Sequence, residues 1–148
     1  MPTQEPVTRT LIVEREWRIP LEKVWRALTD GALLEQWLMK NDFQLEAGHR
    51  FHFRTAPTNQ WDGIVSCEVL EVDAPGSGDF ARLIYSLDAA GLSTVVTWTL
   101  TPKPSGVQLR MEQSGFLPED DYNFQGATRA WQRFIAALEE CSSDLPDA

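Results

Sequence analysis

The chain has 148 residues, of which 43% are hydrophobic and 24% are charged, and its formal net charge at pH 7 is -9. These values are typical of one globular domain with a single core, and they exclude a disordered or fibrous chain. The negative charge disfavours nucleic acid as a partner, because binding to it depends on Lys and Arg neutralising phosphates.

The sequence also bears on the compartment of the protein. No apolar run reaches the roughly 20 residues that a membrane-spanning helix requires. The N-terminal segment lacks the basic and apolar regions of a secretory signal, so we expect a cytoplasmic protein. Cys67 and Cys141 lie far apart and belong to no CxxC motif, which predicts two free thiols.

The first predicted element is a strand over residues 10–19, where apolar and charged residues partly alternate. Pro20 ends this strand and suits the first turn of a short helix, whose apolar stripe continues to Thr29. A second short helix, with Thr29 or Asp30 as its cap, carries an apolar face as far as Leu38.

Turn residues then separate six further predicted strands, at about 42–46, 49–55, 61–72, 80–87, 93–101 and 107–115. Their short connections favour antiparallel neighbours, so the sheet has seven strands. A long amphipathic helix begins at Asn123, and we expect frayed tails at 1–8 and 142–148.

This order of elements predicts one α+β domain over residues 1–148, in which a curved antiparallel sheet grips the C-terminal helix. A single helix about 10 Å wide cannot fill the concave side of a twisted seven-stranded sheet, so we expect a hollow between them. Hollows of this kind bind apolar ligands.

Several local strings occur together in this order. They are REWRIP at 15–20, VWRALTD at 24–30, Leu34 with Trp37, VVTWTL at 95–100, Gln125-Gly126, and Trp131 with Leu138. In these strings the chain resembles the helix-grip superfamily of START-like (SRPBCC) domains, and within it the bacterial proteins similar to the activator of Hsp90 ATPase. The resemblance implies the helix-grip fold, and it associates the chain with lipid carriers, cyclases, hormone receptors and co-chaperones.

Large apolar side chains on the sheet and helices should form the wall of the hollow. The predicted wall residues are Trp37, Phe51, Phe53, Tyr85, Trp98, Met111, Trp131 and Phe134, with Tyr85 as a polar handle. Arg15 or Arg54 could anchor a ligand carboxylate through a bidentate pair, the alternative being an ion pair with a neighbouring Asp or Glu.

Two further groups of residues raise the question of a metal. His49 and His52 form a His-x-x-His pair, but residues three apart in a strand point to opposite faces, which predicts solvent-facing or hydrogen-bonded rings and no metal site. The acidic run 119–121 precedes the last helix, where negative charge interacts favourably with the helix dipole, and we expect no calcium there.

No nucleophile elbow or cofactor motif occurs in the sequence, so we expect no cofactor.

The preferred functional hypothesis is a non-catalytic protein that encloses a small hydrophobic or amphipathic molecule, lipid-like or polyketide-like, between sheet and final helix. Two alternatives stay open. One is a co-chaperone-like module that acts on an Hsp90-type ATPase, as the resemblance suggests. The other is a cyclase- or aromatase-like enzyme, which convergent polar groups inside the cavity would support.

Overall fold

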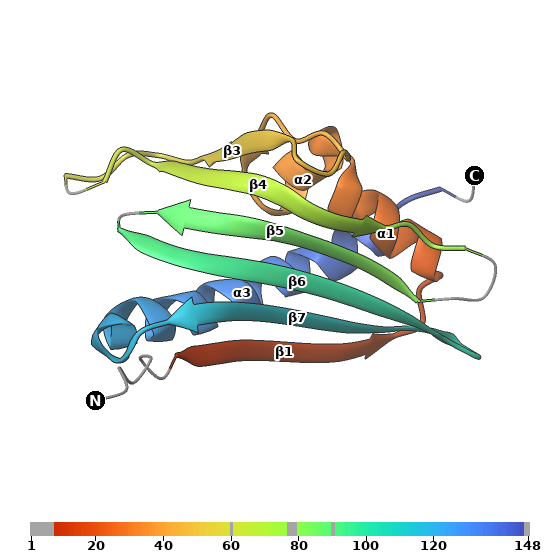
Figure 1. Ribbon diagram of the computed structural model, residues 1–148. Coiled ribbons are helices and arrows are strands. Elements are labelled where there is room, and N and C mark those ends of the chain that lie inside the picture. Colours follow the sequence, from red (N-terminus) through yellow and green to blue (C-terminus); the bar gives the residue numbers. More distant parts are fainter. Residues whose placement is uncertain (1–7, 60, 77–79, 90, 147–148) are drawn as a thin grey trace.

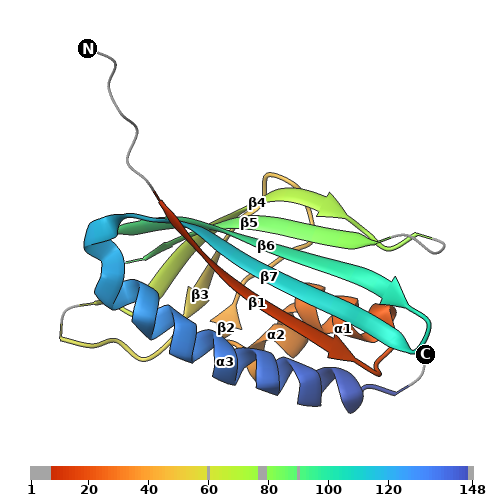
Figure 2. The ribbon, with the colours of Figure 1, turned by 90° about the horizontal axis from the view of Figure 1, so that it is seen from below.

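The computed structural model describes residues 8–59, 61–76, 80–89 and 91–146 (Figure 1). It confirms the predicted α+β helix-grip fold, in which a seven-stranded antiparallel sheet curves around one long helix (Figure 2). The strands lie in the order β1-β7-β6-β5-β4-β3-β2. Most of the predicted N-terminal tail, at 1–7, and the end of the C-terminal one, at 147–148, lie outside the described residues.

The elements follow one another as a strand, two short helices, six strands, a 3-10 turn and the long helix. Their bounds are β1 (Arg9–Trp17), α1 (Leu21–Thr29), α2 (Gly31–Trp37), β2 (Lys40–Asn41), β3 (Arg50–Arg54), β4 (Ile64–Asp73), β5 (Ala81–Ala89), β6 (Leu92–Lys103), β7 (Gly106–Phe116), η1 (Pro118–Asp120) and α3 (Asp121–Ser143).

Local chemistry explains where the first two helices begin. Pro20 precedes α1, where its missing N–H costs nothing because the first turn has no intrahelical acceptor for it. Of the two predicted caps of α2, Asp30 is the one used: its carboxylate accepts hydrogen bonds from the backbone N–H groups of Ala32 at 2.9 Å and Leu33 at 3.4 Å.

The predicted strand at 42–46 is wrong. β2 ends at Asn41, after which the Asp42 carboxylate accepts a hydrogen bond from the backbone N–H of His52. The ring of Phe43 then enters the core, 5.0 Å from the ring of Phe51. A side-chain hydrogen bond and one buried aromatic ring therefore replace a regular ladder in this segment.

The end of α3 also differs from the prediction. The helix continues through Ser143, so the first residues of the predicted tail at 142–148 are helical, and Ser142 is fully buried. No helix of the described residues has the length and hydrophobicity needed to cross a membrane.

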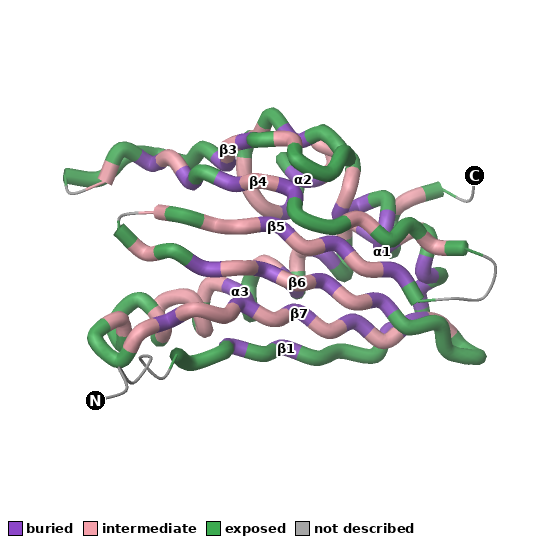
Figure 3. The backbone as a smooth tube through the Cα atoms, viewed as in Figure 1, coloured by how far each residue is buried: buried purple, intermediate pink, exposed green. Residues whose placement is uncertain are grey.

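The core lies between the concave side of the sheet and the helices. Buried and less buried residues alternate along β5, β6 and β7 (Figure 3). The side chains at alternate positions face inward and are buried; they are Leu83, Tyr85, Val96, Trp98, Leu100, Val107, Leu109 and Met111. Leu87 continues this face of β5 and is half-buried. Alternation along a strand thus identified the core face of the central strands.

The three helices divide the concave side of the sheet unequally. α1 and α2 both contact α3, and they lie beside its C-terminal half (Figure 2). The Trp37 indole N–H donates to the carbonyl oxygen of Ala27 at 2.8 Å, which ties α2 to α1. The N-terminal half of α3 has no such neighbour and faces the sheet alone (Figure 2).

Candidate functional site

A hollow of about 390 Å³ lies beneath the N-terminal half of α3, at the end of the sheet opposite α1 and α2. Its lining comes from α3, from the facing ends of β4 to β7 and from the segments that precede β2 and β4. The lining residues are Met39, Trp61, Val65, Leu87, Ala89, Leu92, Gln113, Tyr122, Asn123, Gly126, Ala127, Arg129, Ala130 and Trp131. Most of these side chains are apolar, as in sites that enclose small molecules.

Gly126 contributes to this space from the helix side. A Cβ atom at this position would meet no atom within 4 Å. Glycine inside a helix costs stability relative to alanine, so its presence here is not explained by helix formation. Its effect on the site is to leave room along one wall of the hollow.

A chain of hydrogen bonds closes the inner wall. The Trp131 indole N–H donates to Gln113 Oε1 at 2.8 Å, and Gln113 Nε2 donates to Thr94 Oγ1 at 3.0 Å. The Thr94 hydroxyl in turn donates to the carbonyl oxygen of Leu87 at 2.8 Å. This Gln113 chain joins α3 to β7, β6 and β5 and holds a polar side chain, only 3% exposed, at the hollow.

The sequence contained a signal for Gln113 that the prediction of the wall did not use. Val107, Leu109 and Met111 occupy the inward positions of β7, and the next inward position is Gln113. A polar residue that continues a buried apolar face requires a partner, and this position therefore indicated a polar feature of the interior.

The predicted wall residues divide into two groups in the structure. Trp131 lines the hollow. Phe134 is not a lining residue, but its ring packs on that of Trp131 with centroids 5.9 Å apart. The others lie in the closed core and are not among the lining residues; they are Trp37, Phe51, Phe53, Tyr85, Trp98 and Met111. Aromatic packing therefore fills much of the concave side that the hollow was expected to occupy.

Edge-to-face contacts account for this filling. The Trp98 ring lies 5.9 Å from that of Trp37 and 5.5 Å from that of Trp131. The Tyr85 hydroxyl accepts a hydrogen bond from the Trp98 indole N–H at 3.0 Å. Burial raises the pKa of Tyr85 above its usual value, so the hydroxyl stays neutral, and this polar handle serves the core.

The two predicted arginine anchors are exposed and do not line the hollow. Arg15 donates to the side-chain oxygen of Gln132 at 2.5 Å and to the carbonyl oxygen of Glu14 at 2.7 Å. Arg54 lines a separate depression together with Leu38. The arginine at the hollow is Arg129 of α3, an exposed residue for which no ion pair is found within the described part of the chain.

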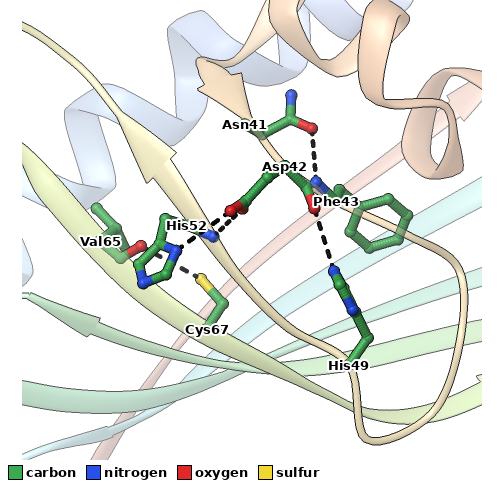
Figure 4. Close-up of polar contacts among 7 residues, drawn as sticks. All are labelled: Asn41, Asp42, Phe43, His49, His52, Val65 and Cys67. Carbon is green, nitrogen blue, oxygen red and sulfur yellow. Dashed lines mark hydrogen bonds and ion pairs between the residues drawn. The ribbon is translucent and has the colours of Figure 1, made fainter.

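Both histidines lie within hydrogen-bonding distance of Asp42, in agreement with the predicted hydrogen-bonded rings (Figure 4). His49 Nε2 is 3.1 Å from the Asp42 carbonyl oxygen, and His52 Nδ1 is 3.4 Å from its carboxylate. Slight burial would raise the pKa of Asp42, but the hydrogen bonds from His52 outweigh it and lower that pKa. Among the described residues, no group of three or more His, Cys, Asp or Glu side chains is arranged to hold a metal ion.

The cysteines are free thiols in the described structure, as predicted. Cys67 is buried, and its burial, together with the charges of Asp88 and Asp42, raises the pKa of its thiol to about 12. A thiol of this kind is a poor nucleophile, because it remains protonated at neutral pH.

The acidic run 119–121 has structural contacts. The Asp120 carboxylate accepts a hydrogen bond from the backbone N–H of Leu117 at 2.8 Å, and the Asp121 carboxylate pairs with Arg9 at 2.7 Å. The Arg9 guanidinium also lies 3.8 Å from the centroid of the Phe124 ring. The two contacts of Arg9 hold the start of α3 against β1, next to the hollow.

A second depression, of about 790 Å³, lies at the turns between β3 and β4 and between β5 and β6. It shares Trp61, Ala89 and Leu92 with the hollow, but its remaining lining is largely polar and includes Asp62 and Asp88. It has few apolar side chains to enclose a ligand, so the hollow beneath α3 is the better candidate site.

The chain is similar to a known family and to several solved structures. A model of the family described as "Activator of Hsp90 ATPase homolog 1-like protein" matches residues 18–143. Protein MLL2253 from Mesorhizobium loti is 42% identical, with a TM-score of 0.81 over 94% of this chain and 100% of that chain. Two more distant structures share the fold. Protein BH1534 from Bacillus halodurans is 24% identical, with a TM-score of 0.74 over 90% of this chain and 96% of that one. CalU16 from Micromonospora echinospora is 20% identical, with a TM-score of 0.73 over 93% of this chain and 78% of that one.

No curated protein matches the chain. The family match begins directly after β1 and includes the other six strands and all of α3, and thus every element that lines the hollow. The chain therefore belongs to the family of Activator of Hsp90 ATPase homolog 1-like proteins.

Proposed function

We propose that this protein binds a small apolar or amphipathic molecule in the hollow beneath the N-terminal half of α3. The observation that carries the proposal is an apolar hollow of about 390 Å³ that the aromatic core leaves open at one end of the sheet. This volume lies near the lower end of the roughly 300–1,000 Å³ typical of small-molecule sites.

The chemistry of the lining favours binding over catalysis. Among its described residues are no His, Asp or Glu side chains that could transfer a proton. Met39, Leu92 and Trp131 instead offer apolar surface, and burying such surface stabilises a complex by about 25 cal/mol per Å² before the costs of association. The ligand would therefore be held mainly by its apolar body.

The asymmetry of the fold supports this assignment. α1 and α2 occupy the space beside the C-terminal half of α3, whereas its N-terminal half covers the sheet without their help. A fold with no ligand to accommodate gains stability from filling such a space, because interiors pack densely. A small molecule would complete the core at this end.

The first test is native mass spectrometry of freshly purified protein, with denaturing release and identification of any bound molecule. The matched variants are Ala127→Phe, which adds a ring at the lining of the hollow, and Ala136→Phe, which adds the same ring on the exposed side of the same helix. We expect Ala127→Phe to lose the bound molecule and Ala136→Phe to retain it.

Apo protein is tested by thermal shift against dodecanoate, a sterol and 1-naphthol. A clean apo mass with no shift for any of these probes would overturn the proposal. In that case the outer surface is the next place to look, and stimulation of an Hsp90-type ATPase is the assay for the co-chaperone alternative.

A further inference from the structure

Aromatic residues aside, the buried polar side chains of the described residues are Thr94, Gln113 and Ser142, and among these Gln113 is the one that lines the hollow. Ser142 lies near the other end of α3, and Thr94 stands behind Gln113 in the hydrogen-bond chain. A ligand in the hollow therefore meets one buried polar group, the amide of Gln113.

The chemistry of its partners determines which way this amide points. An indole N–H can only donate, so the atom next to Trp131 must be the amide oxygen. The Thr94 hydroxyl donates its single hydrogen to the carbonyl oxygen of Leu87. Toward Gln113 it can therefore only accept, so the amide atom next to it is the nitrogen. The partners on both sides, Trp131 and Thr94, therefore require the same orientation of the Gln113 amide.

A count of hydrogen-bonding capacity leaves the amide half used. The side chain of glutamine has two N–H donors and an oxygen with two lone pairs. Gln113 uses one N–H on Thr94 and one lone pair on Trp131, and it has no further partner among the described residues. One donor and one acceptor remain on a side chain that is 3% exposed.

We propose that Gln113 determines the specificity of the hollow, by pairing its spare N–H and spare lone pair with a neutral hydroxyl or carbonyl group at the inner end of the ligand. The inference rests on the proposed function and adds the chemical class of the ligand: an apolar body with one neutral hydrogen-bonding group. A hydroxyl fits best, because it can accept from the N–H and donate to the carbonyl oxygen.

The same geometry discriminates against an anion at the inner end. A buried carboxylate needs a cation or several donors, and Gln113 offers a single N–H beside its own electron-rich oxygen. Arg129 is the cation of the lining, but it is exposed. An anionic group on the ligand would therefore remain at the mouth, in water.

Planar aromatic probes suit the test, because Trp61 and Trp131 both line the hollow. We would measure by calorimetry the affinities of 1-naphthol, 1-methylnaphthalene and 1-naphthoate, which share a ring system and differ in one substituent. The readout is the affinity ratio of 1-naphthol to 1-methylnaphthalene, compared between proteins so that the solvation of the free probes cancels.

Two variants separate recognition from structural support. Gln113→Met keeps an unbranched side chain of similar length but removes both hydrogen-bonding groups. Thr94→Val breaks the same hydrogen-bond chain from behind, and Thr94 is not a lining residue. Circular dichroism of both variants verifies that they are folded.

We expect the ratio to fall about threefold to tenfold in Gln113→Met, the equivalent of one net hydrogen bond, and to be retained in Thr94→Val. We also expect 1-naphthoate to bind the wild-type protein about tenfold or more weakly than 1-naphthol.

An equal fall of the affinity ratio in both variants would show that Gln113 only supports the structure and would overturn the inference. If both neutral probes bind and the ratio is unchanged in Gln113→Met, the inference fails while the proposed function stands. If neither neutral probe binds the wild-type protein although native mass spectrometry or another probe shows a bound molecule, the inference fails and the proposed function stands. If no molecule is found by any of these measurements, both fail.

Discussion

Replacing Trp98 by Phe should lower the free energy of unfolding by about 2–5 kcal/mol, although the residue stays aromatic. Trp98 is fully buried between the rings of Trp37 and Trp131, so the smaller ring forfeits apolar contacts of about 1–2 kcal/mol. Its indole N–H also donates to the buried hydroxyl of Tyr85. Phe leaves that hydroxyl without its partner, which costs about 1–3 kcal/mol more.

A double-mutant cycle isolates the second contribution. Tyr85→Phe alone strands the indole N–H of Trp98, whereas the double variant Trp98→Phe/Tyr85→Phe strands neither group. We therefore expect the double variant to be more stable than the sum of the single losses predicts, by about 1–2 kcal/mol. Strict additivity would refute the reasoning that the pair satisfies two buried polar groups.

Urea unfolding followed by far-UV circular dichroism measures these differences, and a loss of this size shifts the midpoint by on the order of 1–2 M. Trp25→Phe is the matched control, since Trp25 is buried at 8% exposure and no hydrogen bond of its indole is found in the described part of the chain. It should lose only the packing contribution. A loss as large as that of Trp98→Phe would argue against a special cost for the stranded hydroxyl.

Three further predictions follow from the described contacts. Gly126→Ala should raise the free energy of unfolding by about 0.5–1 kcal/mol and the melting temperature by about 1–4 °C, because the added Cβ meets no atom and alanine favours the helix. A lower melting temperature would contradict this prediction. Iodoacetamide at pH 8 should alkylate the partly exposed Cys141 well before Cys67, since Cys67 is buried and its thiol has a pKa of about 12; equal labelling in peptide mass maps would contradict it. Asp42→Asn should be less stable than the wild type at pH 7, because hydrogen bonds from His52 lower the pKa of Asp42 below 3.8 in the folded state. That stabilisation is present above the unfolded pKa and is lost as pH falls through the folded one, so the difference between the two proteins should shrink in melts below about pH 4.

The sequence by itself determined the class of fold and most of the elements. The apolar stripe after Pro20 and the alternation along the central strands are local patterns, and each specifies the period of one element without knowledge of the others. The exception at 42–46 has its cause in the tertiary structure. The Phe43 ring packs in the core against Phe51, and the Asp42 carboxylate accepts a hydrogen bond from the backbone N–H of His52. Both Phe51 and His52 belong to β3.

Only the tertiary structure decided where the interior is filled and where it is open. The alternation of apolar and polar residues along a strand predicts which side chains face the interior. It does not predict whether a side chain from another element packs against them and fills the space. Trp98 faces inward as predicted, yet Trp37 and Trp131 from two helices close on it and leave no space beside it for a ligand. Gln113 could be read as a polar break in an apolar face, whereas its partners, and hence the donor and acceptor it leaves unused, depend on how α3 and β6 meet around it.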